Sequence, residues 1–246
     1  MNGSEKTIKA LIIHLGRADE RQIQVELLER MLPCPAMVLR AVDSLDLDDK
    51  TIFQFYRKQL YRPFYPFALS KNEIACFLSH RRAWQKIVDE GMDAGFIIED
   101  DVALDERFDE VFRFAVEKAN EESFIRFPFR VRETGKIIAE KGDIKLIRPT
   151  EIGLGQVAQL VGCNAARKLL DATATFDRPV DTTEQLYWKT GVHPQVVLPP
   201  VVREISKKLG GSTIKSKHSF FGHLYREIAR PLYRHRIKVL SKRQEG

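Results

Sequence analysis

The sequence predicts an α/β sandwich on a mostly parallel mixed sheet, followed by a basic C-terminal helical tail. Short runs that are apolar throughout, such as residues 10–15 and 95–98, are typical of strands buried on both faces of a sheet. Between them apolar residues recur at helical spacing, and alternating strands and helices favour parallel pairing through crossover connections. The 246 residues are 43% hydrophobic and 30% charged, which excludes a mainly disordered or polytopic membrane protein.

Local signals place the elements along the chain. Pro33 ends the first helix, because proline lacks the N–H that would continue it. Ser70 and Glu73 fit a capping box, which predicts a clear helix down to Gly91. An aromatic-rich loop region with one short helix precedes it. We expect strands over residues 10–15, 37–39, 95–98, 124–129, 144–147, 155–162 and 195–198, and helices over 19–32, 70–91, 106–120, 164–174 and 181–191.

Charge divides the chain into two parts. The whole sequence carries a net charge of +6, but residues 203–246 hold twelve Lys and Arg against three Asp and Glu, a net of +9. Residues 1–202 therefore carry a net charge of −3. We predict a slightly acidic globular domain over 1–202 and a basic amphipathic tail over 203–246, with different roles.

Cysteine spacing and the lengths of the apolar runs indicate in which cellular compartment the protein is expected. Cys34, Cys76 and Cys163 are widely spaced and form no C-x-x-C pattern, which favours a reducing environment. The first apolar run is too short for a signal-peptide core, and no run approaches the roughly 18 apolar residues that span a bilayer. We expect a cytoplasmic protein whose membrane contact is peripheral.

Three consecutive carboxylates follow the apolar run at 95–98. In an extended chain alternate side chains share a face, so Glu99 and Asp101 are expected to point one way and Asp100 the other. Two carboxylates at the carboxyl end of a buried strand can hold a hard divalent cation, and ligands usually bind at this edge of an open α/β sheet. The alternative is a solvated turn whose acids cap the following segment.

Four sequence blocks occur in a characteristic order. They are IIHLGR at 12–17, AVD at 41–43, LSKNEIACFLSHRRAW at 69–84 and FIIEDDV at 96–102. Together they closely resemble glycosyltransferase family 25, the lipopolysaccharide-type and collagen-type galactosyltransferases. The resemblance implies a GT-A-like, Rossmann-type fold for the catalytic domain, a nucleotide-sugar donor, an inverting transfer and a divalent metal, Mn²⁺ or Mg²⁺.

The resemblance gives roles to residues at the strand ends. Asp101 is the first candidate metal ligand and Glu99 the second, while Asp100 is expected to meet sugar or ribose hydroxyls. Arg17 and Arg21 follow the first strand, where the nucleotide would lie, and the guanidinium fork suits phosphate. A surface helix face is the alternative for both arginines.

Three further residues are candidates for the donor site. Asp43 follows a strand, where it could accept hydrogen bonds from ribose or uracil or instead cap a loop or helix. Ser79 and His80 belong to the long helix, and His80 lies two turns beyond Glu73, so both face the same side. A buried structural histidine is the alternative for His80, and Glu73 already serves the capping box.

An inverting transfer needs a general base that deprotonates the acceptor hydroxyl. The resemblance implies a carboxylate in the second half of the domain. Asp181, at the end of the P-V-D sequence, is the first candidate for this catalytic residue and Glu184 the second. Asp181 could equally cap the helix that follows it.

The tail mixes aromatic, aliphatic and basic side chains. Phe220, Phe221, Leu224 and Ile228 fall at spacings that can share a helical face. This composition is typical of an amphipathic helix lying on an anionic membrane surface. A disordered solubilising tail and a nucleic-acid patch are the alternatives, and a lipid-linked acceptor favours the membrane.

These observations predict a metal-dependent, inverting glycosyltransferase. It would move a hexose, galactose or glucose, from a UDP-sugar to a lipopolysaccharide-type, lipid-linked oligosaccharide. We expect it to be peripheral on the cytosolic face of the inner membrane. The competing hypothesis is a non-enzymatic membrane or nucleic-acid adaptor with a degenerate transferase body, against which the intact acids at 99–101 argue.

Overall fold

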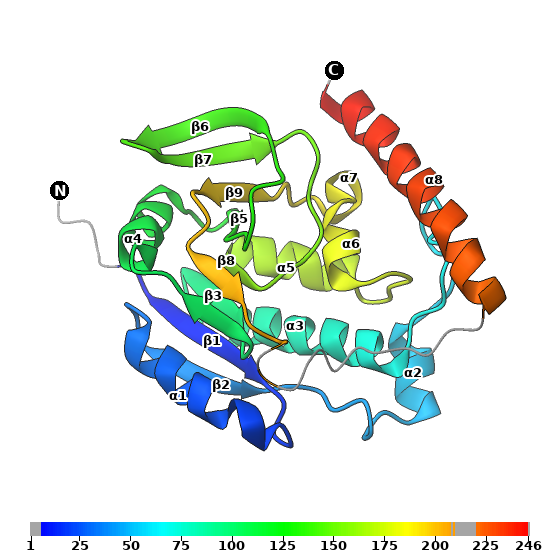
Figure 1. Cartoon of the computed structure of the whole chain (residues 1–246), viewed down its shortest axis with the longest axis horizontal. Helices are drawn as coiled ribbons and strands as arrows, with labels where there is room; N and C mark the ends of the chain where they lie inside the picture. The colour runs from blue at the N-terminus through cyan, green and yellow to red at the C-terminus, as the bar shows by residue number, and fades with distance from the viewer. Residues whose placement is uncertain (1–5, 208, 210–219, 246) are drawn as a thin grey trace.

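The computed structural model of the chain describes residues 6–207, 209 and 220–245. Within these residues a central sheet of eight strands has the order β2-β1-β3-β8-β5-β9-β7-β6, and a two-stranded sheet pairs β10 with β4 (Figure 1). The strands are β1 (Ile8–His14), β2 (Ala36–Arg40), β3 (Ala94–Glu99), β4 (Val102–Leu104), β5 (Phe124–Arg126), β6 (Gly135–Lys141), β7 (Ile144–Pro149), β8 (Ala158–Gly162), β9 (Gln195–Leu198) and β10 (Val202–Glu204).

Helices connect most of these strands, and one long helix follows the last of them. The first helix is preceded by the 3-10 turn η1 (Asp19–Arg21). The helices are α1 (Gln22–Met31), α2 (Asp49–Phe55), α3 (Lys71–Asp89), α4 (Phe108–Lys118), α5 (Cys163–Ala172), α6 (Val180–Glu184), α7 (Tyr187–Thr190) and α8 (Phe220–Glu245).

The sheet is mixed, which confirms the predicted α/β class. β1 pairs in parallel with β2 and β3, and β5 pairs in parallel with β9. The other pairs of the large sheet are antiparallel, so its parallel share is smaller than the strand–helix alternation suggested. The β6–β7 connection explains part of this, because a tight turn at Gly142 can join only antiparallel strands.

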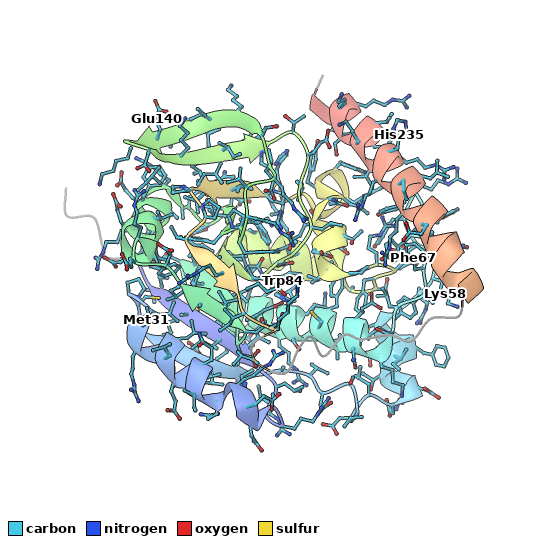
Figure 2. The ribbon with its side chains drawn as sticks, in the orientation of Figure 1. Met31, Lys58, Phe67, Trp84, Glu140 and His235 are labelled. Carbon is cyan, nitrogen blue, oxygen red and sulfur yellow. The ribbon has the colours of Figure 1, made fainter. Side chains whose placement is uncertain are left out.

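Two hydrophobic cores cover the two faces of the sheet. Successive residues of β1 alternate between them, since Ile12 packs in the core under α1 and α4 whereas Leu11 and Ile13 pack in the core under α3 and α5. Trp84 of α3 is among the largest fully buried side chains and lies near the centre of the molecule in Figure 2. Both faces are therefore covered, as the uniformly apolar strands predicted.

The long helix begins as the sequence indicated. The Ser70 side chain accepts a hydrogen bond from the Glu73 backbone N–H, while the Glu73 carboxylate accepts from the backbone N–H of Ser70. This reciprocal capping box fixes the N-terminus of α3. It thereby fixes where Ser79 and His80, two turns further on, meet the end of β3.

The polypeptide returns to the end of β3 after leaving the large sheet. β10 pairs antiparallel with β4, so that Glu204 lies opposite Val102. The backbone N–H of Ile205 then donates to the carbonyl of Asp101 at 2.8 Å. The segment around residue 203, where the charge composition changes, is in this way built into the edge that carries the three acids.

The basic tail forms α8, which packs along one side of the body next to α6 and α7 (Figure 1). Tyr233, Ile237 and Ser241 are buried at helical spacing. The buried Arg178 donates to the Tyr233 hydroxyl at 2.7 Å, and Tyr187 donates to the Ser241 carbonyl at 3.1 Å. The described part of α8 therefore uses its apolar stripe to bind the body.

The face that suggested membrane insertion lies elsewhere on this helix. The side chains of Phe220, Phe221, Leu224 and Ile228 lie outside the described residues. Among the helices that the structure describes, none is both long enough and apolar enough to cross a membrane.

Candidate active site

A cavity of about 530 Å³ opens at the carboxyl ends of β1, β2 and β3. This is the edge of an α/β sheet at which ligands usually bind. The cavity brings together eight of the predicted site residues, and Asp43 and Glu184 are not among its lining residues. Those eight are Arg17, Arg21, Ser79, His80, Glu99, Asp100, Asp101 and Asp181.

The middle acid of the triplet is held from both sides. Asp100 Oδ2 lies 2.8 Å from His14 Nδ1, and Asp100 Oδ1 accepts a 2.6 Å hydrogen bond from Arg21. Arg21 is buried, not exposed on a helix face, and its guanidinium also lies 3.2 Å from Asp101. Because both oxygens of Asp100 have protein partners, its role in the geometry is to position Arg21 and His14.

The first acid faces α3. His80 Nε2 lies 3.4 Å from Glu99 Oε1, and the Gln159 side-chain amide donates to His80 Nδ1 at 3.0 Å. Since Nδ1 accepts, the ring proton is on Nε2 and points to Glu99. Burial lowers the pKa of His80 to about 4, so the ring is neutral at physiological pH.

Glu99 and Asp101 are costly to ionise in this setting. Burial raises the pKa of Glu99 to about 8 and that of Asp101 to about 7, and neighbouring carboxylates add to both shifts. Asp101 Oδ1 is buried and has no hydrogen-bond partner among the described residues. A divalent cation bound beside these acids would favour the ionised carboxylates, and the unpartnered oxygen of Asp101 could serve as a ligand.

Cys76 adds a second donor set that spacing alone did not suggest. One ligand atom each of Cys76, His80 and Glu99 lies within 4.8 Å of the others. Sulfur and imidazole favour softer ions than a carboxylate pair does. Burial raises the pKa of the Cys76 thiol well above its usual range, which opposes the thiolate that a metal needs. Carboxylate oxygens such as those of Glu99 and Asp101 are hard donors, which favour ions such as Mg²⁺ and Mn²⁺.

Arg17 and Ser79 mark the end of the cavity nearest β2. Arg17 donates through Nε to Asp43 at 2.6 Å and stays half exposed, so Asp43 reaches the cavity only through this arginine. That hydrogen bond lowers the pKa of Asp43. The Ser79 hydroxyl accepts from the Val42 backbone N–H at 2.8 Å, which joins α3 to the segment after β2.

Asp181 lies in the first turn of α6 and lines the cavity. Its Oδ2 accepts from the Gly155 backbone N–H at 3.0 Å, and its Oδ1 accepts from the Thr182 hydroxyl at 3.2 Å. Gly155 has a φ of +92°, a conformation that side chains strongly disfavour. The glycine thus allows the loop to present its N–H to a carboxylate that lines the cavity.

Glu184 lies outside the cavity lining, in what we call the Arg126 cluster: Arg126, Glu133 and Glu184. Arg126 donates to Glu133 at 3.0 Å, and its Nε lies 3.5 Å from Glu184 Oε2. Burial raises the pKa of Glu184 to about 8. Arg126 also donates to the carbonyl of Gly155 at 2.7 Å, so the cluster supports the loop that binds Asp181.

Four further lining residues did not stand out in the sequence. Glu204 arrives through β10, and Tyr65 comes from the aromatic-rich segment before α3. Arg230 and Arg234 come from α8, one helical turn apart. Their spacing was visible in the sequence, but only the packing of α8 places them at this cavity.

A mixed α/β sandwich with a polar cavity at its carboxyl strand ends is the class of protein that the four sequence blocks predicted. The model of the family described as glycosyltransferase family 25 (LPS biosynthesis protein) matches residues 7–183. The chain belongs to glycosyltransferase family 25.

Curated relatives share only part of this sequence. Procollagen galactosyltransferase 1 of Danio rerio is 33% identical over 95 residues, which are 37% of this chain and 15% of that protein. The inactive glycosyltransferase 25 family member 3 of Mus musculus is 29% identical over 121 residues, 48% of this chain and 20% of that protein. The matches thus span a fifth or less of these relatives.

Solved structures show a distant likeness. The mannose-1-phosphate geranyltransferase from Thermus thermophilus aligns with a TM-score of 0.41 and 11% identity, over 84% of this chain and 80% of that chain.

Proposed function

We propose that the protein is a metal-dependent, inverting glycosyltransferase that moves galactose or glucose from a UDP-sugar to a lipopolysaccharide-type glycan. The observation that carries the proposal is the pair of carboxylates at the strand ends. Glu99 is partly buried, with its side chain 30% exposed, and Asp101 is buried and keeps an oxygen without a hydrogen-bond partner among the described residues. The family membership supports a sugar transfer at this cavity.

Glu99 and Asp101 would hold the cation. When bound, the ion supplies positive charge that stabilises the diphosphate of the departing UDP. Asp100 holds Arg21 against Asp101, so that the arginine partly compensates the acids before any ligand arrives. Arg17 keeps exposed guanidinium donors at the β2 end, where they suit a phosphate of the donor.

Asp181 would act as the general base. The acceptor hydroxyl oxygen forms the new bond to the anomeric carbon, the bond from that carbon to UDP breaks, and the hydroxyl proton passes to the carboxylate. Gly155 and Thr182 fix the orientation of Asp181 through one hydrogen bond to each oxygen. Glu184 is less suited to this step, because it is buried beside Arg126 and does not line the cavity.

UDP release from a panel of UDP-sugars, with and without Mn²⁺ and with lipopolysaccharide core oligosaccharides as acceptors, tests the proposal. We expect metal-stimulated release with UDP-galactose or UDP-glucose. Asp181→Asn should reduce turnover by about 10²–10⁴-fold, the usual contribution of a general base, while UDP binding stays unchanged. Full turnover by this variant would contradict the role of Asp181.

A non-enzymatic binding protein is the second candidate, because a mouse relative carries the name of an inactive family member. Calorimetric titration with UDP and Mn²⁺ separates the two. The transferase should bind UDP more tightly when Mn²⁺ is present. A protein that has lost the donor site would not bind UDP, whether or not the ion is present.

A peripheral position on the cytosolic face of the membrane, with a lipid-linked acceptor, belongs to the same proposal. The exposed cations of α8, among them Arg236, Lys242 and Arg243, support an electrostatic contact with anionic lipid. Its buried stripe packs on the body, so salt should release the protein from phosphatidylserine vesicles. Salt-resistant binding would point to inserted apolar side chains instead.

A further inference from the structure

The helix α8 lines one side of the cavity. Tyr233 and Ile237 are buried against Leu186, Tyr61 and Tyr65, and the hydrogen bond from Arg178 to the Tyr233 hydroxyl fixes the helix to the segment that precedes Asp181. The side chains on the neighbouring face of α8 are held at the cavity as a result.

Arg230 and Arg234 occupy that neighbouring face. Both line the cavity, and they are four residues apart, so they lie on one side of the helix. The Arg230 guanidinium lies 5.7 Å from the centre of the Phe67 ring, which is seen beside α8 in Figure 2. This stacking orients one of the two cations without neutralising it.

Arg230 and Arg234 differ from a neighbouring lysine in their charge partners. Among the residues that the structure describes, no carboxylate forms an ion pair with Arg230 or Arg234. Lys238, one turn further along the same helix, does pair with Glu151 at 2.5 Å. Two cations that line a polar cavity and form no ion pair with a described carboxylate can bind an anion.

Position indicates which substrate would carry the anion. Tyr65 lines the same end of the cavity and packs edge-on against Tyr233, with ring centres 5.4 Å apart. The charges of Asp181 and Arg230 act on the pKa of Tyr65 in opposite directions, so both lie near its hydroxyl. Arg230 therefore lies on the same side of the cavity as Tyr65 and the proposed base, and Arg234 follows it one helical turn later.

We propose that Arg230 and Arg234 form the acceptor subsite and bind an anionic group, a phosphate or a carboxylate, carried by the acceptor sugar. Guanidinium groups bind both kinds of oxyanion through paired hydrogen bonds, and the Tyr65 ring offers an apolar surface to the sugar. This inference rests on the proposed function, because it defines the acceptor end relative to Asp181.

Binding of three small sugars tests the subsite. Galactose 6-phosphate, galacturonate and galactose are titrated into the full chain, with ligand-observed NMR as the readout. We expect the two anionic sugars, or one of them, to bind at least tenfold more tightly than galactose, and the better anion identifies phosphate or carboxylate as the group. Equal affinity of all three would overturn the proposal.

Variants assign the binding to the two arginines. Arg230→Gln/Arg234→Gln should reduce the anionic sugars to the affinity of galactose and leave UDP binding with Mn²⁺ within twofold. The matched control Arg243→Gln removes an exposed charge of the same helix that does not line the cavity, and it should change neither. The double Lys variant should recover part of the affinity for the anionic sugars.

The remaining outcomes separate this inference from the proposed function. A double Gln variant that loses UDP binding but keeps its preference for anionic sugars would place the arginines at the donor and overturn the subsite. Failure of the unaltered protein to bind UDP would instead contradict the proposed transferase, and the sugar titrations would still report on the anion subsite.

Discussion

Two groups of buried or partly buried acids among the described residues differ in what stands next to them. The strand-end acids, Glu99, Asp100 and Asp101, line the cavity. The Arg126 cluster places Glu133 and Glu184 around one arginine, outside the cavity lining. Each group contains a carboxyl whose pKa burial raises to about 8, Glu99 in one and Glu184 in the other.

The difference shows that a perturbed acid is not by itself a sign of a site. The Arg126 cluster has its counter-charge built in, and Arg126 directs its other donors to the carbonyls of Gly153 and Gly155. At the strand ends, Asp100 and Asp101 share Arg21 as their ion-paired guanidinium. Both groups hold buried oxygens without a hydrogen-bond partner among the described residues, Oδ1 of Asp101 in one and both oxygens of Glu184 in the other. Access to the cavity is therefore what marks the place where a cation can act.

Removing Arg126 should have the largest effect on stability. Arg126→Met leaves two acids buried without their partner, and breaking a buried ion pair in this way costs about 3–5 kcal/mol in free energy of unfolding. Urea denaturation measures the loss. Arg113→Met, which removes an exposed arginine paired with Asp109, should cost well under about 1 kcal/mol. Equal losses of unfolding free energy in the two variants would show that the ion pairs of the Arg126 cluster do not stabilise the fold.

Asp101→Asn should act on activity and leave the fold intact. It removes a proposed metal ligand, and we expect metal-stimulated UDP release to fall by about 10²–10³-fold, as when one preorganised charge-stabilising group is lost. The melting temperature should be unchanged or higher, because a buried like charge is gone. The matched control Glu184→Gln should keep turnover within about threefold; a fall as large as that of Asp101→Asn would erase the contrast between the two acid groups.

Glu184→Gln should change how stability depends on pH. Burial raises the pKa of Glu184 from an ordinary 4.5 to about 8 in the folded protein, although Arg126 opposes the shift. The folded state therefore holds this proton more tightly, and stability falls as pH rises from about 4.5 to 8, by at most about 1.4 kcal/mol per pH unit. The variant lacks this fall, so the difference in melting temperature between the two proteins should grow from pH 5 to about 8 and level off above it. Parallel curves would mean that Glu184 is not held protonated.

The smallest effect is expected at the exposed end of the cavity. Asp43→Asn weakens the half-exposed pair with Arg17, and we expect UDP binding to weaken by about twofold to fivefold, the range of an exposed ion pair. Asp46→Asn alters an exposed acid of the same turn and serves as the control. Calorimetry with UDP and Mn²⁺ compares the two, and a loss above about a hundredfold would make Asp43 a direct ligand of the nucleotide.

The strand-end half of the site could be predicted because its signals are local. The acids at 99–101 directly follow a uniformly apolar strand, and the capping box at Ser70 fixes the phase of α3, so His80 could be placed toward them. The hydrogen-bond and ion-pair partners of each acid could not be predicted from the sequence. Alternation predicted Glu99 and Asp101 on one face, but whether Asp100 meets a sugar or Arg21 depends on how η1 folds back.

The other half of the site depends on contacts between distant segments. Gln159 meets His80 across 79 residues, and Arg178 meets Tyr233 across 55. The stripe of Tyr233, Ile237 and Ser241 is weakly apolar and stands among cations, so composition suggested a detached tail. The charge boundary at 203 separates compositions, whereas β10 and α8 carry the chain back to the cavity.

The contacts of Arg178, which hold α8 against the body, should leave a trace in the sequences of homologous proteins. Its guanidinium is fully buried and donates to Asp177, to Tyr233 and to the carbonyls of Tyr61 and Pro63. Replacing any one side chain of this set leaves a buried donor or acceptor without a partner. Replacing the partners together need not leave such a group unpaired. The identities at 177, 178 and 233 should therefore be inherited together, so that correlated changes among homologues would reveal which of them carry a C-terminal helix docked in this way.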